Sequence, residues 1–129
     1  MNKAAVVVIS HSAKIAEGIV DLVSQTKQPD VQVFSAGGTE AGEIGTSADK
    51  IKAVLEQADG EGGVLVFYDI GSAVMNAELA LDMLPDLEGG VEIMDAPIVE
   101  GTYVAVVEAG MGKALEEVAE AVRRQEFVK

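Results

Sequence analysis

Two uninterrupted apolar runs, residues 4–9 and 63–68, constrain the fold of this chain more than any other feature. The first is six residues long and has valine and isoleucine over most of its length. Runs of this length and β-branched composition are typical of strands buried on both faces, as in parallel sheets covered by helices. Residues 31–34 and 90–94 alternate in polarity, which predicts two further strands nearer the edges of the sheet.

The segments between and after these strands carry apolar residues at helical spacing. The repeating positions are Ile15, Ile19, Leu22 and Val23; Ala48, Ile51, Val54, Leu55 and Ala58; Val74, Ala77, Leu81 and Leu84; and, near the end of the chain, Leu115, Val118, Ala119 and Val122. Residue types that begin helices stand at Ser12, at Thr46 or Ser47 and near Ser72, and residues that end them at Gly60 and Pro85. Residues 103–107 fit a strand or a helix, and we favour a short buried helix.

The order of these elements predicts an α/β fold with an open, mainly parallel sheet and helices on both faces. The two most apolar strands, the first and third, belong at the centre, which predicts the spatial order 2-1-3-4. In that order the winding of the chain reverses between strands 1 and 3. Ligands of such sheets bind at this switch point, outside the carboxyl ends of the strands.

The balance of charges limits the partners that this chain can have. There are 22 acidic and 9 basic residues, a formal net charge of −13. Such a surface repels the phosphates of nucleic acids and of anionic membranes, so neither is expected as a partner. It attracts a basic protein, although the same charge also serves solubility alone.

The chain contains no cysteine, which excludes disulfides, iron–sulfur clusters and thiolate zinc sites. Its longest apolar run is far too short to span a membrane, and no signal-peptide pattern opens the sequence. We therefore expect a cytoplasmic protein whose residues 1–129 form one domain.

The only histidine, His11, follows the first strand, and Asp69 follows the third. The predicted strand order makes these two strand ends neighbours at the switch point. A carboxylate that accepts a hydrogen bond from Nδ1–H leaves Nε2 of the imidazole free to react. The pair therefore predicts nucleophilic chemistry at Nε2 of His11, and the alternative is a structural histidine paired with a carboxylate.

Small and hydroxyl residues surround this pair and favour an anion. Ser12 and Ser72 each open a predicted helix, whose N–H groups attract negative charge. Gly71 allows close approach of the backbone, and the end of the second strand supplies the flexible residues Gly37, Gly38 and Thr39. Each residue alone is typical of turns and caps, but together they predict a site of the size of a phosphate group.

Several phosphate-binding classes lack their required residues here. There is no P-loop, no dinucleotide-binding glycine motif, and no acidic cluster after the first strand of the receiver-domain type. A histidine phosphatase would need an arginine beside its histidine, and none is near. A metal site would need Glu40 and Glu43 beside His11 and Asp69, and we favour no metal. The pattern fits a relay that releases a phosphoryl group, with no bound cofactor.

Several motifs together resemble one family over the chain from Val6 to about Val122. They are residues 7–12 (Val-Val-Ile-Ser-His-Ser), 17–18, 37–39, 45–47, 69–73 (Asp-Ile-Gly-Ser-Ala), 76–78 and 96–101 (Ala-Pro-Ile-Val-Glu-Gly). This set resembles the DhaM proteins, the phosphotransferase subunits of PEP-dependent dihydroxyacetone kinases. Their relevant domain is similar to the IIA domain of mannose-class sugar phosphotransferase systems.

The resemblance implies a homodimeric phosphohistidine carrier. His11 would accept a phosphoryl group from the phosphocarrier protein HPr and pass it to ADP bound in the DhaL subunit. Asp69 would orient His11, and Gly71 and Ser72 would line the phosphoryl pocket. Some DhaM chains carry further HPr-like domains, so for this shorter chain we expect a separate HPr.

Two other functions stay open at this point. The same fold and histidine would serve a mannose-class IIA domain in sugar transport or regulation, although residues 96–101 and 71–73 look like DhaM. A plain anion-binding fold without turnover is the third possibility.

Transfer between proteins must exclude water, so an apolar docking surface should surround His11. The candidate side chains are Ile15, Ile70, Val74 and Met75. Helical spacing assigns Ile15 and Val74 to the core, which leaves Ile70 and Met75 as the predicted partner-binding residues.

Overall fold

The computed structural model describes residues 2–127, and its centre is a sheet of four parallel strands in the order β2-β1-β3-β4. The strands are β1 (Ala5–Ser10), β2 (Val33–Gly37), β3 (Val64–Tyr68) and β4 (Val91–Met94). The helices are α1 (Ala13–Ser24), α2 (Ala48–Ala58), α3 (Ser72–Asp82), α4 (Ile98–Gly110) and α5 (Leu115–Arg124). The predicted strand order is confirmed, with the two most apolar strands in the middle.

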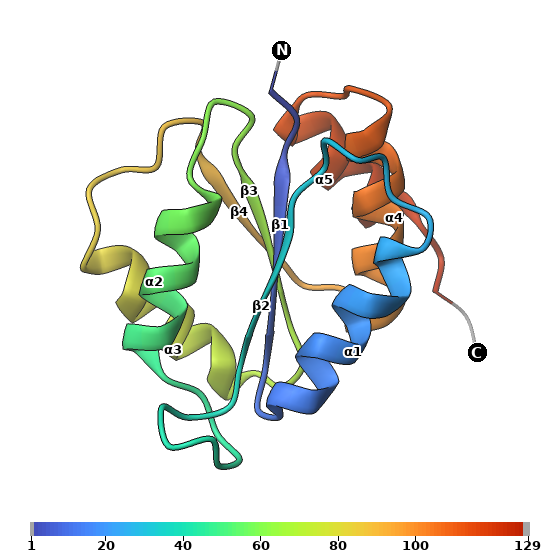
Figure 1. Cartoon of the computed structure of the whole chain (residues 1–129). Coiled ribbons are helices and arrows are strands. Elements are labelled where there is room, and N and C mark those ends of the chain that lie inside the picture. Colours follow the sequence, from blue (N-terminus) through green and yellow to red (C-terminus); the bar gives the residue numbers. More distant parts are fainter. Residues whose placement is uncertain (1, 128–129) are drawn as a thin grey trace.

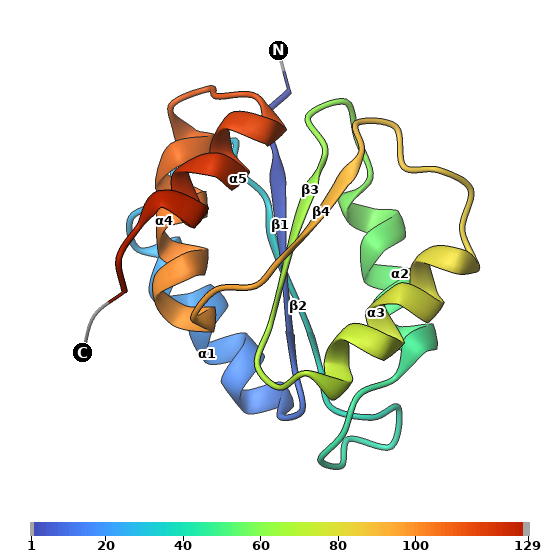
Figure 2. The same ribbon diagram turned by 180° about the vertical axis from the view of Figure 1, so that it is seen from behind.

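Helices cover both faces of the sheet, as Figures 1 and 2 show: α2 and α3 lie on one side, and α1, α4 and α5 on the other. Alternate residues of β1 therefore enter two separate cores. Val6 and Val8 pack with α1, α4 and α5, whereas Val7 and Ile9 pack with α2 and α3. This two-sided burial explains why β1 carries no polar residue before its last position.

The second strand differs from the sequence-based prediction. It begins at Val33 rather than Val31 and continues to Gly37, which pairs with Ser10 at the end of β1. A side chain at Gly37 would clash, since a Cβ atom built there lies 2.8 Å from the Cα atom of Ala13. Gly37, which the sequence placed in a flexible turn, is thus the last residue of β2, and because it has no side chain, α1 packs closely against it.

Residues 103–107 form a helix, as favoured, but this helix is the thirteen-residue α4 rather than a short buried one. One side of α4 is exposed, with Tyr103 45% accessible. The assignment of Ile15 to the core is wrong, because its side chain is 52% exposed and Ala16 takes the buried position instead. Leu22 is likewise exposed, and Val74 is half-buried.

Two of the predicted helix starts are confirmed by hydrogen bonds. The hydroxyl oxygens of Ser12 and Ser47 accept from the N–H groups of Ile15 and Lys50. Ser72 differs, since it is the first residue of α3 and Gly71 precedes it without a side-chain cap. The hydroxyl group of Ser72 is therefore available for another contact.

Candidate active site

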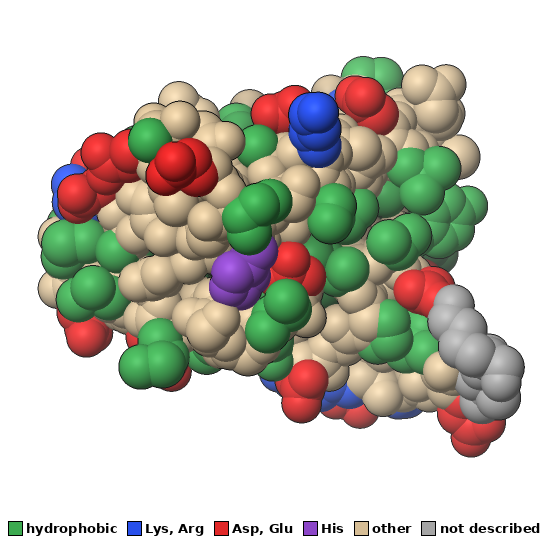
Figure 3. All heavy atoms as spheres, turned by 90° about the horizontal axis from the view of Figure 1, so that it is seen from below, with side chains coloured by type: hydrophobic (Ala, Val, Ile, Leu, Met, Phe, Trp, Pro, Cys, Tyr) green, Lys and Arg blue, Asp and Glu red, His purple; other side chains and the backbone are tan. Residues whose placement is uncertain are grey.

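His11 and Asp69 meet at the carboxyl ends of β1 and β3. Because Ile9 pairs with Tyr68, the residues that follow the two strands leave the sheet at about the same height. Nδ1 of His11 lies 3.0 Å from Oδ1 of Asp69, and the two side chains are 22% and 16% exposed. The predicted juxtaposition of these two residues is present, at the edge of the sheet seen from below in Figure 3.

Asp69 accepts four hydrogen bonds. Oδ2 accepts from the N–H group of His11 and the hydroxyl group of Ser10, and Oδ1 from the N–H group of Ile70 and from the His11 ring. Burial by itself raises the pKa of Asp69, but the bonds from His11, Ser10 and Ile70 outweigh burial and hold the pKa below its usual value. The carboxyl group is therefore ionised at neutral pH.

These bonds also decide where the hydrogen of the neutral imidazole lies. Backbone N–H groups can only donate, so each oxygen of Asp69 already acts as an acceptor. Nδ1 of His11 must then be the donor to Oδ1, which leaves the lone pair of the ring on Nε2. Nε2 lies 2.8 Å from Oγ of Ser72, whose hydroxyl group is the donor of that hydrogen bond.

Ser10 is a member of this site that the sequence reasoning did not select. Its side chain is fully buried, and its hydroxyl oxygen lies 2.8 Å from Oδ2 of Asp69 and 3.0 Å from the N–H group of Ser12. The signal in the sequence was a hydroxyl residue at the last position of an otherwise apolar strand.

The two helix starts beside the histidine offer backbone N–H groups. At α3 the N–H groups of Ala73 and Val74 already bond to nearby carbonyl oxygens, whereas those of Gly71 and Ser72 have no partner in the described part of the chain. A Cβ atom at Gly71 would meet nothing within 4 Å, so the space beside this residue is open. This open helix start next to Nε2 suits an anion.

Ser12 and the segment after β2 are more occupied than predicted. The oxygen of Ser12 caps α1, and Thr39 exchanges backbone and side-chain hydrogen bonds with Glu43. Gly38 has a φ of 75° and donates from its N–H group to the carbonyl oxygen of Ser10. Gly37, Gly38 and Thr39 thus shape the β2 side of the site, and no hydrogen bond joins them to the His11 ring.

Exposed apolar side chains stand on the segments that frame His11, and Figure 3 shows hydrophobic atoms on either side of the histidine. Ile70, directly after Asp69, is 59% exposed, and Met75 in the first turn of α3 is 72% exposed. Ile15 and Ile44 are also exposed. The two predicted partner-binding residues are thus accessible beside the site.

In the described part of the chain, His11 has neither a basic side chain bonded to it nor a cluster of metal ligands beside it. No hydrogen bond or ion pair joins a lysine or arginine to His11 or Asp69 within residues 2–127. Over the same residues, no three potential metal ligands gather, and Glu40 bonds instead to Ser47. None of the helices within residues 2–127 combines the length and the apolar composition that a membrane span needs.

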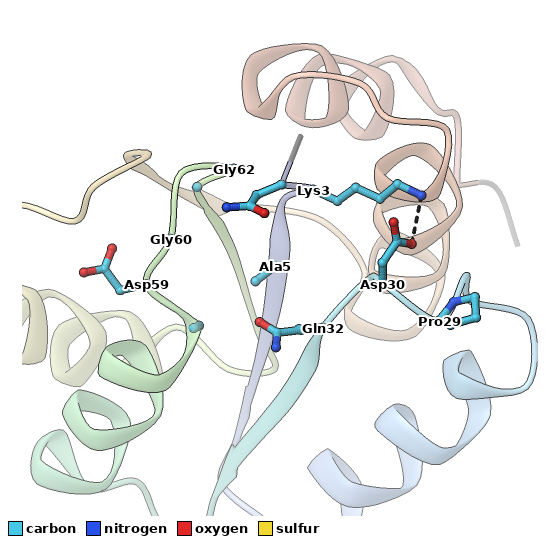
Figure 4. A pocket seen from close by; sticks show the side chains of 11 residues that line it. Lys3, Ala5, Pro29, Asp30, Gln32, Asp59, Gly60 and Gly62 are labelled. Carbon is cyan, nitrogen blue, oxygen red and sulfur yellow. Dashed lines mark hydrogen bonds and ion pairs between the residues drawn. The ribbon is translucent and has the colours of Figure 1, made fainter.

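A separate hollow lies at the opposite edge of the sheet, near the N-terminus (Figure 4). Its lysine is already engaged, because Nζ of Lys3 lies 2.9 Å from Asp30 and 2.8 Å from the carbonyl oxygen of Gly110. Asp59 accepts from the N–H group of Glu88. These groups stabilise the fold, so the edge with His11 is the stronger candidate for chemistry.

Comparison with known proteins shows the family of the chain. A family model described as a PTS system fructose IIA component, EIIA-man, matches residues 5–119. The phosphoryl donor subunit DhaM of PEP-dependent dihydroxyacetone kinase 1 from Listeria innocua is 39% identical over 114 residues, 88% of either chain. The phosphotransferase subunit DhaM of the PTS-dependent dihydroxyacetone kinase from Lactococcus lactis is 34% identical over 119 residues, which is 92% of this chain and 93% of that one.

Among solved structures, the crystal structure of EF1359, a protein of unknown function, superposes with a TM-score of 0.86 at 32% identity. The match covers 98% of this chain and 97% of that one. The whole parallel sheet with its helices therefore occurs in a related protein.

Proposed function

Because the chain belongs to the EIIA-man family of phosphotransferase-system components and, within it, to the DhaM phosphoryl donor subunits of dihydroxyacetone kinase, we propose that His11 carries a phosphoryl group between two proteins. The donor is HPr, and the acceptor is ADP bound in the DhaL subunit. The hydrogen bond between Nδ1 of His11 and Asp69 carries this proposal, since it leaves Nε2 with the reactive lone pair. These partners imply a cytoplasmic protein.

The transfer reaction needs no proton movement at His11. The lone pair of Nε2 attacks the phosphorus atom of the phosphohistidine donor; the new N–P bond forms as the donor's N–P bond breaks and its electron pair returns to the donor nitrogen. The ring of His11 becomes cationic and keeps its hydrogen on Nδ1, where the carboxylate of Asp69 stabilises the charge. In the second step an oxygen of the terminal phosphate of ADP attacks the phosphorus atom on His11. The new O–P bond forms as the N–P bond breaks, and the electron pair of the N–P bond returns to Nε2.

Backbone and hydroxyl groups hold the phosphoryl oxygens in this proposal. The hydroxyl group of Ser72 leaves the lone pair of Nε2 and donates to a phosphoryl oxygen instead. The N–H groups of Gly71 and Ser72 stand at the start of α3, and Ser12 stands at the start of α1. Gly37, Gly38 and Thr39 form the wall on the β2 side. Where backbone N–H and hydroxyl groups hold the phosphoryl oxygens in place of a bidentate arginine, the group is bound weakly enough to be passed on.

Ile70 and Met75 provide the docking contact for both partners. Their exposed side chains extend the apolar surface beside Nε2, and closing this surface against a partner excludes water from the phosphohistidine. Methionine adapts its shape readily, which suits one surface that binds two different proteins. The acidic surface attracts basic partners to the site.

The proposed homodimer forms through α4. Its exposed side chains Val99, Tyr103 and Val107 repeat every four residues, and Met111 continues the line. No lysine or arginine lies in α4. Two copies with a net charge of −13 repel each other unless they meet through an uncharged surface, and this stripe can meet itself across a two-fold axis.

The test is reconstitution with PEP, enzyme I, HPr and ADP-loaded DhaL. The wild-type protein should gain one acid-labile, base-stable phosphoryl group per chain and pass it to DhaL, whereas His11→Ala should gain none by intact mass. A His11→Ala protein that still gains the group contradicts the carrier role. Phosphorylation by HPr without transfer to DhaL would favour a mannose-class IIA domain in transport or regulation.

A further inference from the structure

Ser10 carries a fully buried hydroxyl group at the last position of the otherwise apolar strand β1. Within residues 2–127, the fully buried polar side chains are those of Ser10 and Thr102. Thr102 bonds to the carbonyl oxygen of Ile98 in its own helix, whereas Ser10 bonds to Asp69, 59 positions away. Burying a hydroxyl group is unfavourable unless its hydrogen bonds are satisfied. The role of Ser10 therefore follows from its hydrogen bond to Asp69.

The direction of the hydrogen bonds at Ser10 follows from its neighbours. The N–H group of Ser12 donates to Oγ of Ser10 across 3.0 Å. The single hydrogen of the hydroxyl group is then directed at Oδ2 of Asp69, 2.8 Å away. Ser10 thereby links the start of α1, just after His11, to the carboxylate that holds the His11 ring.

We propose that Ser10 is a positioning residue of the transfer site, which holds the carboxylate of Asp69 and, through it, the hydrogen on Nδ1 of His11. This inference rests on the proposed function and adds a side chain that, together with the N–H groups of His11 and Ile70, keeps the carboxylate oriented. The carboxylate of an aspartate turns readily about its last bond. Ser10 and the N–H group of His11 together hold Oδ2, and the N–H group of Ile70 holds Oδ1, so that Oδ1 stays beside Nδ1.

Loss of the Ser10 hydroxyl group weakens this arrangement at two points. Oδ2 of Asp69 keeps only the His11 N–H group, and the N–H group of Ser12 loses its acceptor. The carboxylate then turns more freely, and part of the population carries the ring hydrogen on Nε2. Those molecules have no lone pair on the nitrogen that faces the partner, so they do not accept a phosphoryl group.

The tautomer of His11 can be measured directly, because His11 is the only histidine and its two ring nitrogens give unambiguous signals. We would record ¹⁵N NMR spectra of labelled wild-type protein, Ser10→Ala and Ser10→Cys at a pH where the ring is neutral. Thr102→Val is the matched control, since it removes a buried hydroxyl group that bonds to the carbonyl oxygen of Ile98 and not to Asp69. The rate of phosphoryl transfer from HPr is measured for the same four proteins.

The wild-type protein and Thr102→Val should show the hydrogen on Nδ1, Ser10→Ala a mixture of both tautomers, and Ser10→Cys an intermediate ratio because a thiol donates weakly. Transfer to Ser10→Ala should slow in proportion to the Nδ1–H tautomer that is lost, about twofold if the two tautomers are equally populated. A folded Ser10→Ala protein with the wild-type tautomer overturns the proposal, and so does an unchanged transfer rate.

Two further outcomes separate this inference from the proposed function. If Ser10→Ala does not fold by circular dichroism, the Ser10→Cys spectrum decides: a mixture supports the positioning role, and hydrogen on Nδ1 alone contradicts it. If the wild-type protein takes up no phosphoryl group, the proposed function fails, but a tautomer shift in Ser10→Ala still upholds the role of Ser10.

Discussion

Oδ1 of Asp69 lies 3.0 Å from Nδ1 of His11, although the two residues are 58 positions apart in the chain. The contact exists because β1 and β3 are neighbours in register, so that their carboxyl ends lie side by side. Asp69 cannot rotate away without losing hydrogen bonds from two backbone N–H groups. The imidazole is thus held by a carboxylate that is itself held by the main chain and by the hydroxyl group of Ser10.

Asp69→Asn should retain the fold and slow phosphoryl transfer by about 10³-fold or more, because an amide N–H group facing Nδ1 favours the wrong tautomer. ³¹P NMR of the wild-type phosphoprotein should show the Nε2 isomer. Asp95→Asn is the matched control at the end of β4, where the carboxylate accepts from Tyr68 instead. A signal from the Nδ1 isomer in the wild-type protein means that the role given to Asp69 is wrong.

The stability of the protein should depend on the ionisation of Asp69. Its pKa is lowered in the folded protein, so the stabilisation is complete above the unfolded pKa of about 4 and is lost as the pH falls through the folded pKa. At pH 7, Asp69→Asn should lower the free energy of unfolding by about 1–3 kcal/mol, since backbone donors lose an acceptor. Urea unfolding of the wild-type protein and Asp69→Asn between neutral and acidic pH tests this. The difference between their free energies of unfolding should shrink below about pH 4. A difference that does not change with pH contradicts the prediction.

Ile70→Ser and Met75→Ser should each slow transfer from HPr and to DhaL about 10- to 100-fold, because burying one such side chain against a partner contributes about 1.5–3 kcal/mol. Rapid-quench measurements of the two half-reactions test this separately for each partner. Leu22→Ser is the control, since Leu22 is an exposed apolar residue almost three turns into α1, away from His11. Unchanged rates in both half-reactions would show that docking uses other residues.

Tyr103→Glu should convert the proposed dimer into a monomer, because a charge in the centre of the α4 stripe meets its own copy across the two-fold axis. Sedimentation equilibrium measures the association. Gln57→Glu adds the same charge to an exposed position on α2 and should leave the dimer intact. If the wild-type protein sediments as a monomer, the α4 surface has another role.

Much of the architecture was predictable because it depends on local patterns. The apolar runs of β1 and β3 indicated central strands. Ser12 and the pair Thr46 and Ser47 marked two helix starts, and hydrogen bonds confirm Ser12 and Ser47 as the caps. The prediction of buried residues was wrong where it depended on the surface against which a helix packs. Ile15 and Ala16 both fit helical spacing, but close packing of α1 against Gly37 favours the small Ala16 on the buried side and leaves Ile15 exposed.

By itself the sequence determined the strand order, because strand burial and the connection rules follow from composition and from the order of elements along the chain. The strand order in turn places His11 and Asp69 together at the edge formed by the carboxyl ends of the strands. The sequence could not assign the hydrogen bonds within that edge. Three of its features depend on strand register and side-chain rotation. They are the oxygen of Asp69 that faces Nδ1, the position of Ser72 at Nε2, and the inward turn of Ser10 to Asp69. Those are set only when residues far apart in the chain pack together, since a hydrogen bond requires positions accurate to a few tenths of an ångström.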